Sequence, residues 1–276
     1  MSNDAREEFD SHLARMARVY SARHHPLNEA LDQGLDPRGP DMLVDVAGSY
    51  LRSQSRILDI GCRDASYLIR LVQAHDCRGV GFDPVDWNVQ RARDAVEEAG
   101  LGEQVQIAKG VMERIEQPDD YFDFIWCRDV LEVVEGLQRG LAETARVLQP
   151  DGRMLIYTNF ATELLEPGES RMIHGPLGNV PTNFDEHSME AAFQRAGLVI
   201  DRKDIIGTEW REYQEERAGQ ASQDLLRLAR LRRRREELVG EHGQELYDLA
   251  QASLQWRTYQ FLGKLQPTMY ILKRSV

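Results

Sequence analysis

Two aspartates in the first third of the chain, Asp59 and Asp83, each end a short run of mainly apolar residues. Each run is bounded by polar positions, which is typical of a buried strand. In open α/β sheets, ligands bind just outside the carboxyl ends of the strands. A carboxylate at that edge can accept hydrogen bonds from a bound molecule. The sequence therefore predicts that both carboxylates face one binding site.

The segment after Asp59 has the spacing of a strand-to-helix connection. Residues 56–60 are predicted as the strand, Gly61 permits a tight turn, and apolar residues recur at helical spacing over residues 67–72. The amino end of a helix beside such a turn is a common position for a ligand. The alternative is a structural role, in which Asp59 caps the turn by accepting hydrogen bonds from backbone N–H groups.

The rest of the chain continues the alternation of strands and helices. A long loop rich in glycine and proline is expected at residues 159–183, followed by a helix over residues 186–195. Strands that alternate with helices predict a parallel, doubly wound sheet of the α/β class, and the last strand is expected to return antiparallel. The further strands are expected at residues 79–83, 105–109, 121–127, 153–158, 198–206 and 268–273.

Three parts are expected along the chain. Residues 1–52 are predicted as an N-terminal helical cap, and residues 53–207 with 267–276 as the core. Residues 208–266 carry two leucine stripes around a glycine-containing turn, which predicts a helical hairpin on the ligand side, either a lid or the interface of a homodimer. The basic run within residues 230–235 is either a solvated helix face or an anchor for an acidic ligand.

Composition limits the partners. The net charge is −12, which disfavours a nucleic-acid binder because phosphate backbones bind basic surfaces. The 3 cysteines are too few and too scattered for a disulfide framework or a metal knuckle, so no metal is expected and a reduced compartment is. No apolar leader and no run of 18 apolar residues is present, so the sequence predicts a cytoplasmic protein without a membrane partner.

Four blocks in this order resemble the class I S-adenosylmethionine-dependent methyltransferases that modify small molecules: residues 57–62, 81–83, 122–132 and 145–152. The resemblance implies a Rossmann-like, seven-stranded, mostly parallel sheet with an antiparallel last strand. Two positions depart from the family's glycine-rich turn, because Arg63 and Ala65 stand where glycine is usual. S-adenosylmethionine has no pyrophosphate that must approach bare backbone, so this cofactor tolerates the loss.

The cofactor site is assigned by this resemblance. Asp59 is expected to hold the amino group of S-adenosylmethionine and Asp83 the ribose hydroxyls, while Arg63 either pairs with the carboxylate of the cofactor or points to solvent. The product would be S-adenosylhomocysteine. The full set of expected cofactor-binding residues is Asp59, Gly61, Cys62, Arg63, Asp83, Pro84, Val111, Met112 and Cys127.

The resemblance implies methyl transfer to a small-molecule acceptor, on oxygen first and then on nitrogen or carbon. The family's usual histidine after Leu131-Glu132 is replaced by Val133, so His174, expected in a loop, is the candidate base, with a solvated loop histidine as the alternative. Two other functions stay open: a protein that binds the cofactor without methylating, and an interaction protein that uses the helical hairpin. The residues expected at the acceptor are Tyr20, Arg128, Asn159 and Trp210, with His24 and His25 near the first.

Overall fold

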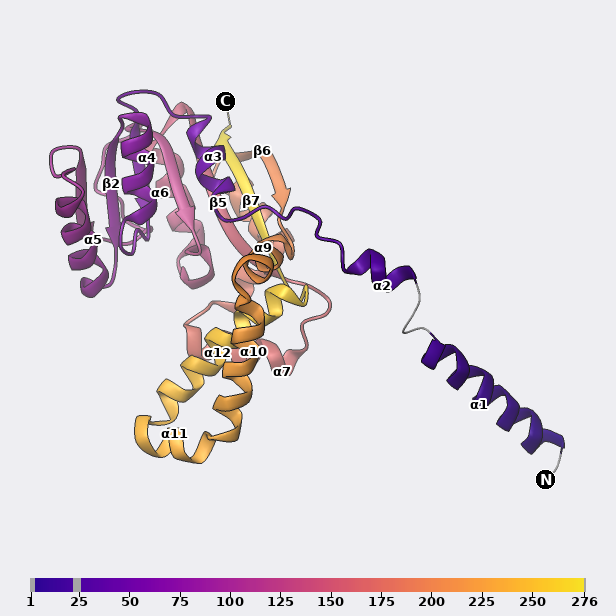
Figure 1. The fold of residues 1–276 in the computed structure, drawn as a ribbon. Coiled ribbons are helices and arrows are strands. Elements are labelled where there is room, and N and C mark those ends of the chain that lie inside the picture. The colour runs from indigo at the N-terminus through magenta and orange to yellow at the C-terminus, as the bar shows by residue number, and fades with distance from the viewer. Residues whose placement is uncertain (1–2, 22–25, 276) are drawn as a thin grey trace. The chain divides into compact units, whose positions relative to one another are not determined.

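The computed structural model describes residues 3–21 and 26–275. The chain divides into two compact units, residues 1–37 and residues 38–276. The first unit contains helices α1 (Asn3–Ser21) and α2 (Pro26–Leu31) (Figure 1). Large apolar side chains along α1, such as Phe9, Leu13 and Met16, are exposed. His24 and His25 lie outside the described residues.

The second unit is built on a seven-stranded sheet with the order β3-β2-β1-β4-β5-β7-β6. All neighbouring strands pair in parallel except β7, which pairs antiparallel with both β5 and β6. The expected mostly parallel sheet with an antiparallel last strand is confirmed. The strands are β1 (Arg56–Ile60), β2 (Arg78–Asp83), β3 (Val105–Lys109), β4 (Phe122–Arg128), β5 (Leu148–Ala161), β6 (Leu198–Ile205) and β7 (Leu265–Arg274).

Helices cover both faces of the sheet, because the central strands carry apolar residues on both sides. Along β4, Ile125 packs in one core cluster and Trp126 in the other. The first cluster includes side chains from α6 (Leu137–Val147) and α8 (Glu186–Arg195). The second includes side chains from α3 (Met42–Gly48), α4 (Ser66–His75) and α5 (Asp86–Glu98). Figure 1 shows α4 and α5 beside strand β2, which both helices contact.

The boundary of the core lies earlier than residue 52. Leu43 and Ala47 of α3 are fully buried in the second cluster, so this segment belongs to the sheet-containing unit. Arg38, the first residue of that unit, forms ion pairs with Asp204 (2.8 Å) and Glu209 (2.6 Å). The structure therefore places the division at Pro37.

The segment expected as one long loop contains a helix. Strand β5 continues to Ala161, α7 spans Pro167–Leu177, and a short 3-10 helix, η3, spans Pro181–Phe184. Glu166 and Glu169 form a capping box, Pro167 stands at the first helical position, and Gly178 ends the helix with a φ of 68°. The loop prediction was wrong because proline and glycine here mark the two ends of a helix.

The insertion between β6 and β7 contains four helices rather than a two-helix hairpin: α9 (Glu209–Ala218), α10 (Gln220–Arg233), α11 (Arg235–His242) and α12 (Gln244–Phe261). The first arm is interrupted at Gly219 and at Arg234. Helix α12 packs against both α10 and α7, at one end of the sheet (Figure 1). The arginines of the basic run are exposed, and Arg234, between α10 and α11, pairs with Glu237 of α11, which matches a solvated face.

Candidate active site

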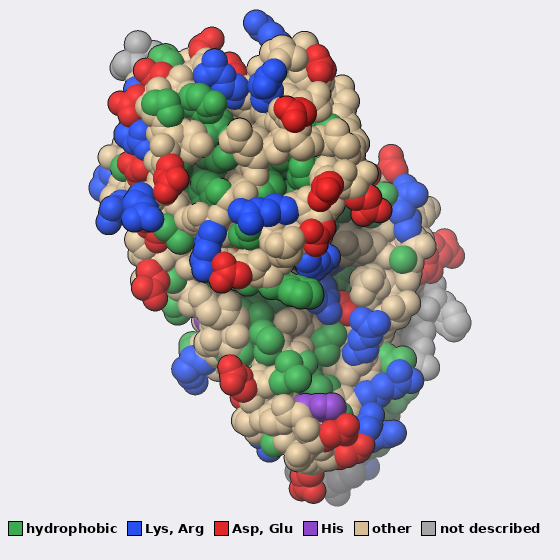
Figure 2. All heavy atoms as spheres, turned by 90° about the vertical axis from the view of Figure 1, so that its left-hand side faces the viewer, with side chains coloured by type: hydrophobic (Ala, Val, Ile, Leu, Met, Phe, Trp, Pro, Cys, Tyr) green, Lys and Arg blue, Asp and Glu red, His purple; other side chains and the backbone are tan. Residues whose placement is uncertain are grey.

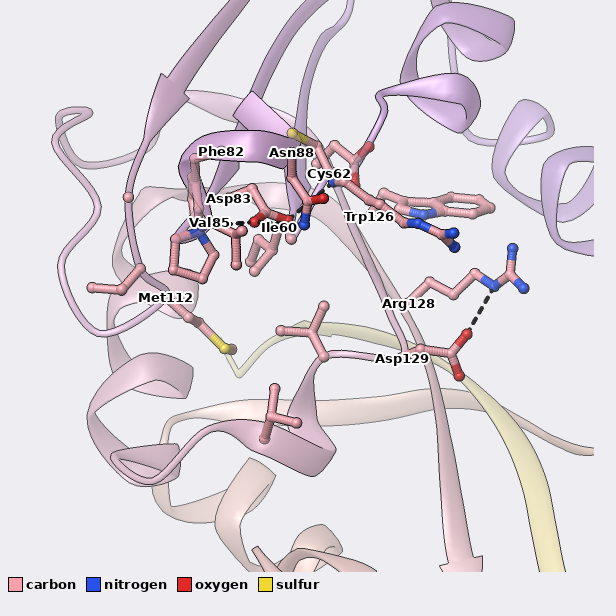
Figure 3. A pocket seen from close by; sticks show the side chains of 18 of the residues that line it. Ile60, Cys62, Phe82, Asp83, Val85, Asn88, Met112, Trp126, Arg128 and Asp129 are labelled. Carbon is pink, nitrogen blue, oxygen red and sulfur yellow. Dashed lines mark hydrogen bonds and ion pairs between the residues drawn. The ribbon is translucent and has the colours of Figure 1, made fainter. Parts of the chain in front are cut away.

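A cavity of about 750 Å³ lies at the carboxyl ends of β1, β2 and β4. Figure 3 shows Asp83 and Asn88 on one side of it and Arg128 with Asp129 at the other end. Its size fits a small organic ligand. Eight of the expected cofactor residues line it: Asp59, Gly61, Cys62, Arg63, Asp83, Pro84, Val111 and Met112.

The turn after β1 keeps the backbone of a glycine-rich loop with a single glycine. Gly61, Arg63 and Ala65 have φ values of 68°, 51° and 56°, so every second residue is left-handed. A side chain at Gly61 would also place its Cβ 2.6 Å from Cγ2 of Val130. Arg63 and Ala65 hold a conformation that costs an L-residue about 1–2 kcal/mol each, which other contacts must offset.

Asp83 supplies one of those contacts. One carboxylate oxygen accepts the backbone N–H of Arg63 (3.1 Å), and the other accepts the backbone N–H of Val85 (2.9 Å) and the side-chain amide of Asn88 (3.1 Å). The carboxylate thus ties the turn after β1 to the turn after β2. Because an ionised carboxylate offers about four acceptor positions, it can still accept a hydrogen bond from a ligand in the cavity.

Asp59 is the most unusual side chain of the site. It is only 4% exposed, and its carboxylate accepts no hydrogen bond from any part of the chain that the structure describes. Burial, followed by the nearby charge of Asp83, raises the pKa of Asp59 well above its usual range, against an opposing effect of Arg128. A buried carboxylate without a partner is costly unless a cation neutralises it, so this end of the cavity is suited to a positively charged group.

The opposite end of the cavity is apolar. Phe82 and Met112 are buried and face it from the ends of β2 and β3, whereas Val111 is about half exposed (Figure 3). Met112 also contacts Gly140 of α6, where an added Cβ would lie 3.0 Å from its Cγ. This end can hold a flat apolar ring, and Glu113, which follows Met112 in the chain, also lines the cavity.

Cys127 is the one expected cofactor residue that does not line the cavity. It is fully buried in the first core cluster, and burial raises the pKa of its thiol well above the usual range. Successive side chains of a strand point to opposite faces, so Trp126 and Arg128 reach the cavity and Cys127 between them does not. The cofactor role expected for its side chain is therefore corrected.

A second cavity of about 370 Å³ adjoins the first, and Arg128, Asp129 and Val133 line both. Its other walls include Tyr157 of β5 and Trp210 of α9, whose rings stack at 4.3 Å. On the face seen in Figure 2, hydrophobic side chains gather in a hollow between the sheet part and the helices of the insertion. The second cavity is therefore built jointly by the sheet and the insertion.

Arg128 lies where the two cavities meet. Its guanidinium lies over the rings of Tyr67 (4.6 Å), Tyr157 (5.7 Å) and Trp210 (5.4 Å), and its Nε lies 3.2 Å from Asp129. Stacking on aromatic faces and pairing with a carboxylate both hold an arginine side chain in place. Arg128 is thereby fixed between the two cavities.

Glu132 is a buried carboxyl group in the wall of the second cavity. It lies in the 3-10 helix η2 (Leu131–Val133), is 3% exposed, and accepts hydrogen bonds through one oxygen from the backbone N–H (2.9 Å) and side-chain amide (3.1 Å) of Asn159. Burial and the neighbouring Asp129 raise the pKa of Glu132 to about 7. A carboxyl group with such a pKa can take up a proton near neutral pH.

Comparison with known proteins identifies this arrangement. Residues 32–203 match the family model described as "Methyltransferase domain", which is more than half of the chain. The chain belongs to this methyltransferase family. The expected resemblance to class I S-adenosylmethionine-dependent methyltransferases is confirmed.

Relatives and solved structures are similar to this chain over different shares of its length. A Bacillus subtilis protein named "Uncharacterized methyltransferase YcgJ" is 30% identical over 132 residues, which cover 48% of this chain and 51% of that protein. The crystal structure of the [4+2]-cyclase SpnF has a similar fold, with a TM-score of 0.67 at 18% identity, and the match covers 86% of this chain and 82% of that chain. A geranyl diphosphate methyltransferase in complex with SAM has a TM-score of 0.64 at 14% identity, with 85% of both chains covered. The chain spans about half the length of the first curated relatives it matches.

The methyltransferase fold brings together some of the expected acceptor residues and excludes others. Arg128 and Trp210 line the second cavity. Asn159 is fully buried behind its wall and lines neither cavity, because its side chain is engaged by Asp129, Glu132 and Gln260. The side chain of Asn159 therefore contacts other residues behind the wall, and its role at the acceptor stays a prediction. Tyr20 is exposed on α1 of the separate first unit, and its role stays a prediction.

The candidate base His174 is not a loop residue. It lies in α7, is 4% exposed, and its ring centroid is 4.2 Å from that of Phe184. It lines neither cavity of the methyltransferase, and burial lowers its pKa. The expectation that His174 serves as the base is corrected. Its segment forms helix α7, and this helix directs the His174 side chain toward Phe184 in a packed cluster.

Sequence reasoning expected the insertion on the ligand side and named Trp210, but it missed two polar residues that the insertion supplies. Arg211 of α9 and Gln260 of α12 line the second cavity, as does Trp256 of α12. Arg211 and Gln260 are 49 residues apart, so only the fold reveals that they meet. Within residues 3–21 and 26–275, no group of histidine, cysteine, aspartate and glutamate could hold a metal ion, and no helix is long and apolar enough to span a membrane.

Proposed function

We propose that the protein transfers the methyl group of S-adenosylmethionine to a small-molecule acceptor in the second cavity, on oxygen first and then on nitrogen or carbon. The observation that carries the proposal is the buried, unpartnered carboxylate of Asp59 in a cavity shared with Asp83. S-adenosylmethionine carries an ammonium and a pair of ribose hydroxyls, which suit these two carboxylates. The residues of the larger cavity fit this cofactor.

When bound, the cofactor supplies an electrophilic methyl group on a sulfonium, with a neutral thioether as the leaving group. The chain contributes binding and orientation. Arg128, Asp129 and Val133 line the passage between the cavities, so an acceptor in the second cavity adjoins the contents of the first. Trp210 and Tyr157 cover one side of the acceptor and exclude water from it.

Glu132 is the proposed proton acceptor in place of His174. It lines the second cavity, one of its oxygens has no hydrogen-bond partner in the described chain, and its pKa is raised to about 7. A hydroxyl acceptor must lose its proton as the new bond to carbon forms, and a carboxylate of this pKa can take that proton at neutral pH. This supports oxygen as the first acceptor atom.

Two measurements test the proposal. Calorimetry with S-adenosylmethionine and S-adenosylhomocysteine should show one site per chain, and Asp59→Asn should weaken binding strongly. Release of S-adenosylhomocysteine should then depend on an added hydroxyl compound drawn from a panel of small aromatic and aliphatic acceptors. Absence of cofactor binding by the folded wild-type protein would refute the proposal.

A second candidate is a protein that binds the same cofactor without methylating. Two observations favour it: the solved [4+2]-cyclase shares the fold, and Arg63 and Val133 replace residues that are usual in methyltransferases. This candidate requires cofactor binding as well, so calorimetry does not separate the two. Tight binding with no S-adenosylhomocysteine released across the whole panel would favour it.

A further inference from the structure

We propose that the second cavity selects an acceptor that carries a carboxylate on a flat aromatic body, and that Arg211 binds this carboxylate. The inference rests on the proposed function, because it assigns the substrate class of the same site. It is carried by the charge balance of the cavity, by the way Arg211 is held, and by the aromatic side chains around it.

Three arginines line the second cavity, and two of them are already neutralised. Arg257 forms a bidentate ion pair with Asp224, at 2.6 Å and 3.0 Å. Arg128 is paired with Asp129 at 3.2 Å. Arg211 has no carboxylate within ion-pair distance in the part of the chain that the structure describes. Arg211 is therefore the one arginine of these three without an ion-pair partner among the described residues, and Glu132, the remaining acid of the wall, offsets its charge only in part because the pKa of Glu132 is raised to about 7.

The partners of Arg211 are neutral amide oxygens. Its Nε donates to Oε1 of Gln260 (2.7 Å), its Nη1 donates to Oε1 of Gln214 (2.7 Å), and its Nη2 also donates to Gln260. A guanidinium has five N–H donors, so these bonds leave about two of them, on the terminal nitrogens, for a ligand. Burial, together with the nearby charge of Arg257, lowers the pKa of Arg211 against the opposing effects of Tyr157, Asp129 and Asp224.

Arg211 is also held in a fixed position. Nε2 of Gln260 donates to Oδ1 of Asn159 (2.6 Å), and the amide of Asn159 donates to Glu132 (3.1 Å). This series of hydrogen bonds sets the orientation of the Gln260 side-chain amide, so that its oxygen faces Arg211 and accepts hydrogen bonds from it. A guanidinium positioned before the ligand arrives loses little side-chain entropy on binding, and its planar fork matches a carboxylate.

The rest of the cavity suits an aromatic body. Tyr157 and Trp210 present stacked rings at 4.3 Å, and Trp256 lines another wall. Flat aromatic side chains bury large apolar surfaces and prefer stacked or edge-on contacts with other rings. The volume of about 370 Å³ is within the range of small-ligand pockets. A compact aromatic carboxylate therefore matches both the charge and the shape of the cavity.

The test measures binding without turnover. The protein saturated with S-adenosylhomocysteine is titrated with 1-naphthoate, with the neutral 1-naphthalenemethanol and with 1-naphthyl phosphate, and quenching of tryptophan fluorescence is followed. We expect 1-naphthoate to bind at least about tenfold more tightly than the alcohol, since a charge-assisted bidentate pair is worth more than about 1.4 kcal/mol. Arg211→Gln should remove this preference and Arg211→Lys should retain part of it.

Two further variants make the test specific. Gln260→Glu places a carboxylate beside Arg211 inside the protein and should abolish the preference for naphthoate with little change in shape. Arg217→Gln is the matched control, because Arg217 lies on the same helix but is exposed, 4.4 Å from the ring of Tyr213. It should leave the preference unchanged. Melting temperature and S-adenosylhomocysteine affinity report whether each variant is folded.

The inference is overturned if naphthoate and the alcohol bind equally to the wild-type protein, if neither binds, or if the preference survives in a folded Arg211→Gln variant. Stronger binding of 1-naphthyl phosphate than of naphthoate overturns the carboxylate assignment. Because the probe titrations involve no methyl transfer, a protein that binds S-adenosylhomocysteine and prefers naphthoate, yet releases no product from any acceptor, would refute the proposed function and leave the inference standing.

Discussion

Replacing Asp59 by asparagine should make the ligand-free protein more stable and unable to hold its cofactor. The folded state raises the pKa of Asp59 well above its usual value of 3.8, so the folded protein binds this proton more tightly than the unfolded chain does. The ionised carboxylate therefore destabilises the fold at every pH above about 4. Asparagine keeps the shape and removes the charge, so the free energy of unfolding at pH 7 should rise.

The pH dependence fixes the sign of this effect. Below the unfolded pKa of 3.8 the carboxyl group is protonated in both states, and wild type and Asp59→Asn should differ little. As pH rises from about 4 through the folded pKa, the stability of the wild type should fall relative to the variant. Urea denaturation of both proteins between pH 4 and pH 8, without ligand, measures this difference.

The same change should weaken cofactor binding severely. Removing one partner of a buried, hydrogen-bonded charge pair costs about 2–5 kcal/mol, or about 30-fold to 5,000-fold in Kd. In the wild type an ammonium ligand favours the ionised carboxylate, so binding should release protons and tighten as pH rises. Calorimetry of S-adenosylhomocysteine in buffers of different ionisation enthalpy detects that release, and Asp59→Asn should show none.

Asp64, in the turn after β1, provides a control because its pKa is shifted in the opposite direction to that of Asp59. Its carboxylate accepts a hydrogen bond from the backbone N–H of Ser66 (3.3 Å), and hydrogen bonding to Ser66 lowers its pKa against the effect of desolvation. Asp64→Asn should therefore be less stable than the wild type at every pH above the unfolded pKa of 3.8, where Asp59→Asn is more stable, and this deficit should disappear only as pH falls below 3.8. The reasoning fails if Asp59→Asn is less stable than the wild type at pH 7, or if its affinity for the cofactor is unchanged.

Three further outcomes are expected. Asp83→Ala should lose about 2–4 kcal/mol of stability, measured by urea denaturation, because three hydrogen bonds from Arg63, Val85 and Asn88 lose their charged acceptor. Arg63→Gly should raise the free energy of unfolding by about 0.5 kcal/mol, because relief of the left-handed backbone exceeds the added entropy of the unfolded chain. If this variant binds S-adenosylhomocysteine with unchanged affinity, Arg63 does not pair with the carboxylate of the cofactor. Glu132→Gln should slow methylation of a hydroxyl acceptor and remove the rise in rate with pH near 7, and an unaltered pH profile would exclude Glu132 as the base.

The sequence predicted the parts of the site that strand ends determine. The carboxyl ends of parallel strands share one edge of the sheet, so Asp59 and Asp83 could be placed together from two short apolar runs. The strand that contains Cys127 was predicted correctly, but the direction of the Cys127 side chain was not. Successive strand residues point to opposite faces, and the sequence alone does not show which face borders the cavity and which the core.

The acceptor side could not be predicted in the same way. His174 was assigned to a loop because the two ends of α7 carry the same residue types as a turn. The contacts of Arg211 and Asn159 with Gln260 join segments 49 and 101 residues apart, and no local pattern reports such contacts. The pKa of Glu132 depends on burial, which a motif does not reveal.

The position of β7 affects how the sheet is assembled during synthesis. Strand β7 leaves the ribosome after β6, yet it is inserted between β5 and β6, and among the described strands β6 pairs with β7 alone. Until β7 has emerged, β5 exposes an unpaired backbone edge and β6 has no neighbour, a condition that favours aggregation or chaperone binding. Nascent chains stalled before residue 265 should therefore be protease-sensitive at β6, even though the strands that carry Asp59 and Asp83 have already been made.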